Sequence, residues 1–103
     1  MPTRTYRLTA IVRSAELDAV GAALQSYLGR EAAIVREPEE IRVTAARAGT
    51  DARTLNRDLL STLRRVERRT TLRAEWTAGD RTERFFDYVP KGVRRSEAGR
   101  PPS

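Results

Sequence analysis

The sequence predicts a small α+β domain in which two helices cover one face of a β-sheet, and three observations lead to this prediction. The chain has 103 residues, enough for one hydrophobic core but not for two. In residues 50–68, apolar side chains recur at helical spacing. One side of the predicted helix therefore carries Leu55, Leu59, Leu63 and Val66. Shorter segments on either side alternate apolar and polar residues, as half-buried strands do. Elements that each hide one side should stack in two layers.

The chain is expected to begin with a strand and a helix. Residues 4–13 alternate, so their inner face should carry Tyr6, Leu8, Ala10 and Val12. Ser14 should cap a helix over residues 15–28, and Gly29 should end it. Gly21 lies in the apolar face of this helix, and we interpret it as allowing a close approach of helix to sheet. The rest of that buried face is formed by Leu17, Val20, Leu24, Tyr27 and Leu28.

Two short strands are expected next, followed by the second helix. The strands cover residues 31–36 and 41–47. A turn is predicted over residues 37–40, between the two strands, because Pro38 fixes φ at the second position of the turn. Thr50 or Asp51 should then cap the helix at its first turn. The opposite side of that helix carries a stripe of arginines: Arg53, Arg57, Arg64 and Arg68.

The last predicted element is a hairpin of residues 70–78 and 81–89 around Gly79-Asp80. With this turn, Glu75 faces Arg84 across the ladder, Arg73 faces Phe86, and Thr71 faces Tyr88. The order βαββαβ followed by one more strand is typical of a ferredoxin-like sandwich with an added C-terminal hairpin strand. We expect residues 1–89 to form this single domain and residues 90–103 to be a flexible basic tail.

Composition excludes several classes of function. The chain has no cysteine and no histidine, which removes disulfides, the usual zinc sites and the commonest general base. We find no phosphate-binding glycine loop and no set of carboxylates with metal spacing, so we expect no enzyme, no cofactor and no metal. The hairpin carboxylates are the weak alternative for catalysis: Glu75, Asp80, Glu83 and Asp87. No apolar run resembles a signal peptide or a membrane span, so we expect a cytoplasmic protein without membrane contact.

The helix-free face of the predicted sheet is the candidate binding site. It should display Ile11 together with arginines beside aromatic rings, and single-stranded nucleic acid is bound by such a layout of arginines and aromatics. The residues expected to contact nucleic acid, another polyanion or a partner are Arg7, Arg42, Arg73, Phe86 and Tyr88. The net charge of +6 is compatible with an anionic partner. The same face could instead join a second copy of the chain or another protein, because exposed aromatic patches mark partner surfaces of many kinds.

A second set of basic residues could supplement anion binding: Arg53, Arg57 and Arg64 on the helix, and Arg94 and Arg95 in the tail. The alternative is a solvated helix face balanced by Asp51, Asp58 and Glu67. The RNA-recognition fold of similar topology carries aromatic residues on its first and third strands. Residues 4–13 and 41–47 offer no aromatic on the outer face, so the sequence disfavours that particular family.

Overall fold

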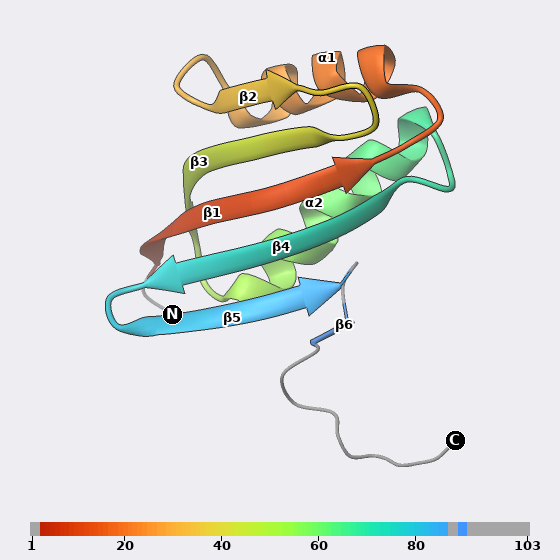
Figure 1. Cartoon of the computed structure of the whole chain (residues 1–103). Helices are drawn as coiled ribbons and strands as arrows, with labels where there is room; N and C mark the ends of the chain where they lie inside the picture. The colour runs from red at the N-terminus through yellow and green to blue at the C-terminus, as the bar shows by residue number, and fades with distance from the viewer. Residues whose placement is uncertain (1–2, 87–88, 91–103) are drawn as a thin grey trace, which may run out of the picture.

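The computed structural model describes residues 3–86 and 89–90, and it shows one sheet covered on one face by two helices (Figure 1). Within these residues the elements follow in the order β1 (Arg4–Arg13), α1 (Leu17–Leu28), β2 (Ala33–Arg36), β3 (Ile41–Gly49), α2 (Ala52–Val66), β4 (Thr71–Ala78), β5 (Arg81–Phe86) and β6 (Val89–Pro90). The strand order across the sheet is β2-β3-β1-β4-β5-β6, and every pairing is antiparallel. The predicted two-layer α+β architecture is confirmed.

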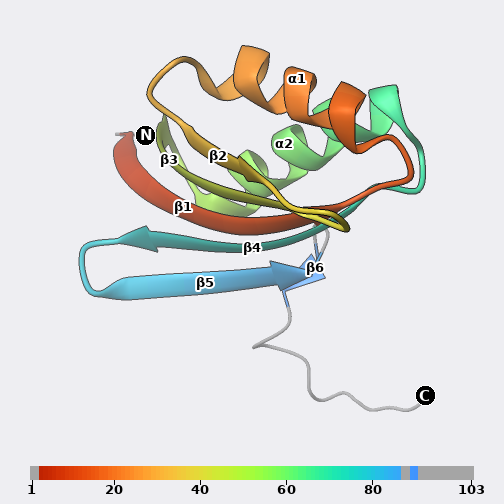
Figure 2. The same cartoon turned by 45° about the horizontal axis from the view of Figure 1, so that its top comes forward.

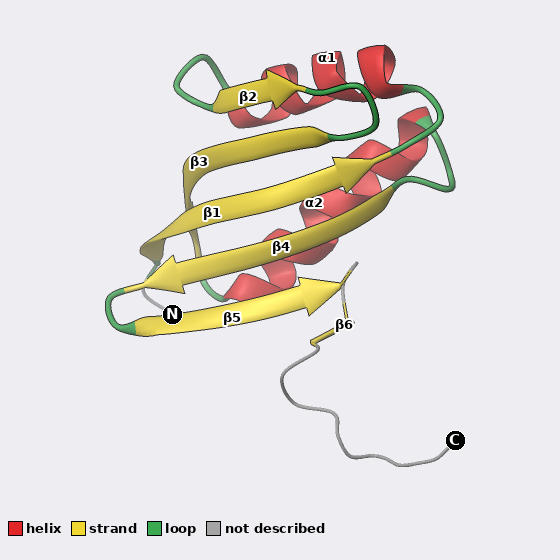
Figure 3. Cartoon of the chain, in the orientation of Figure 1, coloured by secondary structure: helices red, strands yellow, loops and turns green. Residues whose placement is uncertain are grey.

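Both helices lie on the same side of the sheet, which leaves the other side without a helix (Figures 2 and 3). This arrangement follows from the alternation in the strands. In β1 the side chains of Leu8 and Val12 are fully buried, whereas Arg7 and Thr9 between them are exposed. One face of the sheet is therefore apolar and packs on the helices, and the other is polar.

The core fills the space between the helices and the sheet. Leu59 and Leu63 of α2 are fully buried, as predicted, and they share one apolar cluster with Trp76 and Phe85 of the C-terminal hairpin. Burying a side chain of this size contributes about 1.5–3 kcal/mol to the free energy of unfolding. The last hairpin thus belongs to the core rather than being an appendage.

The second helix begins as predicted and ends earlier than predicted. Asp51 is its N-cap, and its carboxylate accepts a hydrogen bond from the Thr54 N–H at 2.7 Å. This bond stabilises the ionised carboxylate and lowers the pKa of Asp51 below its ordinary value of 3.8. The placement of Val66 on the buried side was wrong, because the helix ends at Val66 and 40% of this residue is exposed.

Two predictions for the first helix are corrected. The helix begins at Leu17, and Ser14 does not cap it: the Ser14 hydroxyl accepts from the Glu16 N–H at 3.1 Å and from the buried Thr70 hydroxyl at 3.0 Å. Ser14 therefore ties the start of α1 to the start of β4. Gly21 is not required for a close approach, since a Cβ at this position would lie 3.4 Å from Ile41 Cδ1, an ordinary contact.

The register of the last hairpin is confirmed, but its second strand is shorter than predicted. Gly79 adopts a positive φ of 63° in the turn, and Glu75 pairs with Arg84 as expected. β5 ends at Phe86, and Val89–Pro90 form a separate strand that pairs back with β5. Pro90 has no N–H to donate, which suits it to the edge of a sheet. Pro90, the first residue of the predicted tail, belongs to β6, while Tyr88, the predicted partner of Thr71, and residues 91–103 of that tail lie outside the described residues.

Candidate binding site on the open sheet face

We call the side of the sheet that faces away from both helices the open face. The strand registers place one residue from each of five neighbouring strands in a line across it. This line, which we call the transverse row, consists of Val35, Arg42, Ile11, Arg73 and Phe86. Apolar side chains and guanidinium groups thus alternate across the sheet. The sequence prediction contained four of these five residues, with Ile11 as a member of the same face.

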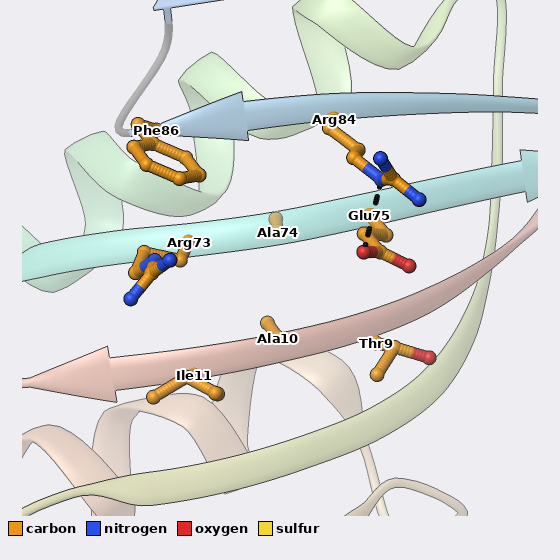
Figure 4. Close-up of a pocket in the computed structure, with 8 residues that line it drawn as sticks. All are labelled: Thr9, Ala10, Ile11, Arg73, Ala74, Glu75, Arg84 and Phe86. Atoms are coloured by element: carbon orange, nitrogen blue, oxygen red, sulfur yellow. Dashed lines mark ion pairs between the residues drawn. The ribbon is translucent and has the colours of Figure 1, made fainter. Parts of the chain in front are cut away.

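At the end of the row on β4 and β5, a guanidinium group packs on an aromatic ring. The Arg73 guanidinium carbon lies 4.5 Å from the centroid of the Phe86 ring, and 39% of Phe86 is exposed. Figure 4 shows the two side chains next to each other, with Ile11 across from them on β1. A guanidinium over a ring face contributes about 0.5–1 kcal/mol at an exposed site. The pair therefore forms an ordered, partly exposed platform.

A shallow depression of about 230 Å³ adjoins this platform. Its far side is formed by an ion pair between Arg84 Nε and Glu75 Oε2, 3.2 Å apart (Figure 4). The residues that line the depression are Thr9, Ala10, Ile11, Arg73, Ala74, Glu75, Arg84 and Phe86. It thus combines apolar, cationic and anionic groups within one small space.

Arg42, at the other end of the row, is held by carboxylates from the β2–β3 turn. Its guanidinium lies 3.2 Å from Glu37 and 3.1 Å from Glu40. Arg13 also pairs with Glu40, at 3.2 Å. The positive charge of Arg42 is therefore largely matched inside the protein. The sequence analysis assigned these glutamates to a turn and did not foresee their contacts.

Arg7 lies on the same face, two positions from Thr9 along β1. It stands between Ala46 on β3 and Thr77 on β4. Within residues 3–86 and 89–90 neither Arg7 nor Arg73 forms an ion pair. Among the arginines predicted for the open face, these two are the ones whose charge the described part of the chain leaves unmatched.

The secondary basic residues do not join the open face. Arg53, Arg57 and Arg64 belong to α2, on the other side of the sheet. Arg57 pairs with Asp58 at 3.5 Å, and Arg64 Nε donates to the Thr70 carbonyl at 2.9 Å. Of the remaining predicted site residues, Tyr88, Arg94 and Arg95 lie outside the described residues.

Val35 is the member of the transverse row that the sequence analysis missed. It lies on edge strand β2, and 53% of it is exposed. Two signals could have identified it: the alternation of Ile34 inward and Val35 outward, and the turn at residues 37–40, which sets Val35 opposite Arg42. With Val35 the row has an exposed apolar residue at each end.

No group of three or more metal-ligating side chains occurs in the described part of the chain. None of the described helices is long and apolar enough to cross a membrane. Comparison of the chain with protein-family models, curated proteins and solved structures finds no match.

Proposed function

We propose that this protein binds single-stranded nucleic acid on its open face, without catalysing a reaction. The observation that carries the proposal is the Arg73–Phe86 platform, at a contact of 4.5 Å and next to Ile11. Bases of single strands stack on aromatic rings and on guanidinium planes. Each such stack contributes about 1–3 kcal/mol to binding and needs no particular base.

Arg7 and Arg73 supply the electrostatic part of the proposed site. Arg7 pairs with Thr77, which lies four residues from Arg73 along β4. At a rise of about 3.3 Å per residue, the two arginine backbones, on neighbouring strands, are therefore offset by about 13 Å along the strand direction. This spacing suits a nucleic acid backbone that follows β4 and contacts both guanidinium groups. Arg42 has a smaller role in the proposal because Glu37 and Glu40 already hold it.

We also assign the first six elements to the ferredoxin-like arrangement, extended by β5. Supporting observations are the order β2-β3-β1-β4, the antiparallel pairings and the position of both helices on one face. Many unrelated functions share this arrangement, so it adds nothing to the argument for nucleic acid. It explains only why one face of the sheet is open.

A second candidate function, self-association through the open face, rests on a different observation. Val35 and Phe86 are two of three large apolar residues that the described chain exposes, and both belong to the transverse row. The third, Val66, lies on the helix side. The ion pairs of Arg42 and Arg84 lower the net charge that two facing copies would have to bring together.

The experiment that tests the proposal is a salt titration of oligonucleotide binding. Unlabelled chain is titrated into a fluorescent single-stranded oligonucleotide, and the anisotropy gives the affinity at several salt concentrations. Each phosphate contact contributes a slope of about −0.7 to the logarithmic plot. Arg7→Ala with Arg73→Ala should therefore reduce the slope by about 1.4.

The matched control removes two arginines from the helix side, Arg53→Ala with Arg57→Ala. It lowers the net charge equally and should leave the slope nearly unchanged. The absence of oligonucleotide binding near physiological salt would overturn the proposal. Equal slopes for the two double variants would show that binding depends on overall charge and not on the open face.

A further inference from the structure

The depression on the open face has the dimensions of a site for one planar ring. Ala10 and Ala74, whose side chains are buried on the helix side, form its floor with their backbone. The Arg73–Phe86 pair and the Glu75–Arg84 pair border it, two residues apart along β4 and β5, or about 7 Å. Its volume of about 230 Å³ is below the range of roughly 300–1,000 Å³ for pockets that enclose a drug-sized ligand.

The Glu75–Arg84 pair presents hydrogen-bonding groups to a ligand in this depression. The side chains are 49% and 68% exposed, so a ligand can reach both. Arg84 Nε forms an ion pair with Glu75 Oε2, whereas Glu75 Oε1 and the terminal nitrogens of Arg84 have no partner among the described residues. A carboxylate oxygen accepts more than one hydrogen bond, and a guanidinium carries five donors. Along the pair, the order of groups is acceptor, acceptor, donor.

We propose that this depression recognises a guanine base, an inference that rests on the proposed function. The Watson–Crick edge of guanine carries two adjacent donors, N2–H and N1–H, followed by the acceptor O6. That order is complementary to Oε1 and Oε2 of Glu75 followed by the guanidinium of Arg84. The other bases present at most one donor group on this edge and cannot satisfy both carboxylate oxygens.

The apolar part of the site completes the recognition. With its edge on Glu75 and Arg84, the ring of the base extends along the strands toward Ile11 and Phe86. Stacking on these side chains supplies affinity for any base, whereas the ion pair supplies the preference. An exposed ion pair stabilises a fold only weakly, so the removal of this pair should leave the fold intact.

The test compares ten-nucleotide uridine RNAs that carry one guanosine, adenosine or cytidine at the centre with the all-uridine strand. We expect the guanosine strand to bind most tightly, by about 5- to 150-fold, the range of one good bidentate contact. Glu75→Gln should abolish this preference, because an amide nitrogen replaces one acceptor. The control Glu83→Gln removes the same charge from the same hairpin, opposite Trp76, and should keep the preference.

Guanine can reach the site within a strand or as a free nucleotide, and calorimetry with guanosine monophosphate separates the two sources. Binding of the free nucleotide that is lost in Glu75→Gln shows that the base site works alone. Guanosine preference in the strand without measurable nucleotide binding shows that the site needs the neighbouring phosphates.

Equal binding of all four strands, or a guanosine preference that survives Glu75→Gln, overturns the guanine inference and leaves the proposed function standing. Binding of the free nucleotide without binding of any strand supports the base site and overturns the proposed function. If neither a strand nor the nucleotide binds, both proposals are wrong.

Discussion

The indole Nε1 of Trp76 donates a hydrogen bond to Oδ1 of Asn56, 3.0 Å away, at the centre of the core. Both residues are almost fully buried, with 1% and 0% of their surface exposed. The bond joins α2 to β4 and provides an acceptor for an N–H that water cannot reach. Because an unsatisfied buried donor costs about 1–3 kcal/mol, this contact fixes how the helix sits on the hairpin.

Asn56→Leu should therefore destabilise the protein by about 1–3 kcal/mol, although leucine is similar in size and more apolar. Chemical denaturation of four proteins measures the effect: wild type, Asn56→Leu, Trp76→Phe and the double variant. In the Trp76→Phe background the donor is gone, so the Asn56→Leu substitution should cost less. The same cost in both backgrounds would show that the bond contributes nothing.

Leu59 and Arg57 lie on opposite sides of α2, and the two positions test its orientation. Leu59 is fully buried, and Leu59→Ala should cost about 2–5 kcal/mol through lost contacts and a cavity. Arg57 is exposed and pairs with its neighbour Asp58 at the surface, so Arg57→Ala should stay within about 0.5 kcal/mol. Urea denaturation compares the two variants. Similar losses would mean that the helix is rotated relative to the sheet.

The Asp51 cap should make stability depend on pH in acid. The pKa of Asp51 is lowered in the folded chain, so its ionised form stabilises the fold above the ordinary pKa of 3.8. This contribution is lost as the pH falls through the lowered folded value. Asp51→Ala should cost about 0.5–2 kcal/mol at neutral pH.

Asp51→Asn is the matched variant for the pH effect, because it keeps a side-chain oxygen for the Thr54 N–H and has no charge to lose. Thermal unfolding of both proteins is followed from neutral pH down to about pH 2.5. The wild type should be the more stable at neutral pH, and the difference should disappear in acid. A difference that does not change with pH would contradict the role of the ionised carboxylate.

The elements that the sequence predicted well are those with a strong local pattern. The alternation of apolar and polar residues identified the buried face of β1. The turn at Gly79, where φ is positive, predicted the register of β4 and β5 from the pair Arg73–Phe86 to the pair Ala78–Arg81. One turn thus placed the Arg73–Phe86 platform and the Glu75–Arg84 pair on the same face. Most of the candidate site follows from that turn and from the period of two in a strand.

The features that the sequence did not reveal depend on contacts between distant segments. Asn56 is polar, and its burial goes with a bond to Trp76, twenty positions away, that the local pattern does not reveal. Ser14 fits the sequence pattern of a helix cap, but in the structure its hydroxyl accepts a hydrogen bond from the distant Thr70 hydroxyl. Glu37 and Glu40 resemble ordinary turn residues, yet they hold Arg42. In each case tertiary contacts override the local preference.

Phe86 distinguishes the two candidate functions, because each depends on it in a different way. If the open face binds single strands, Phe86→Ala should weaken oligonucleotide binding by about 1–3 kcal/mol through lost stacking. The salt slope should change little, since the substitution removes no charge. Anisotropy titrations at several salt concentrations measure both quantities.

If the open face joins two copies instead, Phe86→Glu should produce monomers from an assembly that wild type forms. Sedimentation velocity at low and high salt measures the mass of each protein. The matched control is Val66→Glu, which places the same charge on the exposed apolar residue of the helix side and should leave the assembly intact. A wild-type monomer with measurable oligonucleotide affinity would rule out self-association and favour nucleic acid. A wild-type monomer without such affinity would contradict both functions.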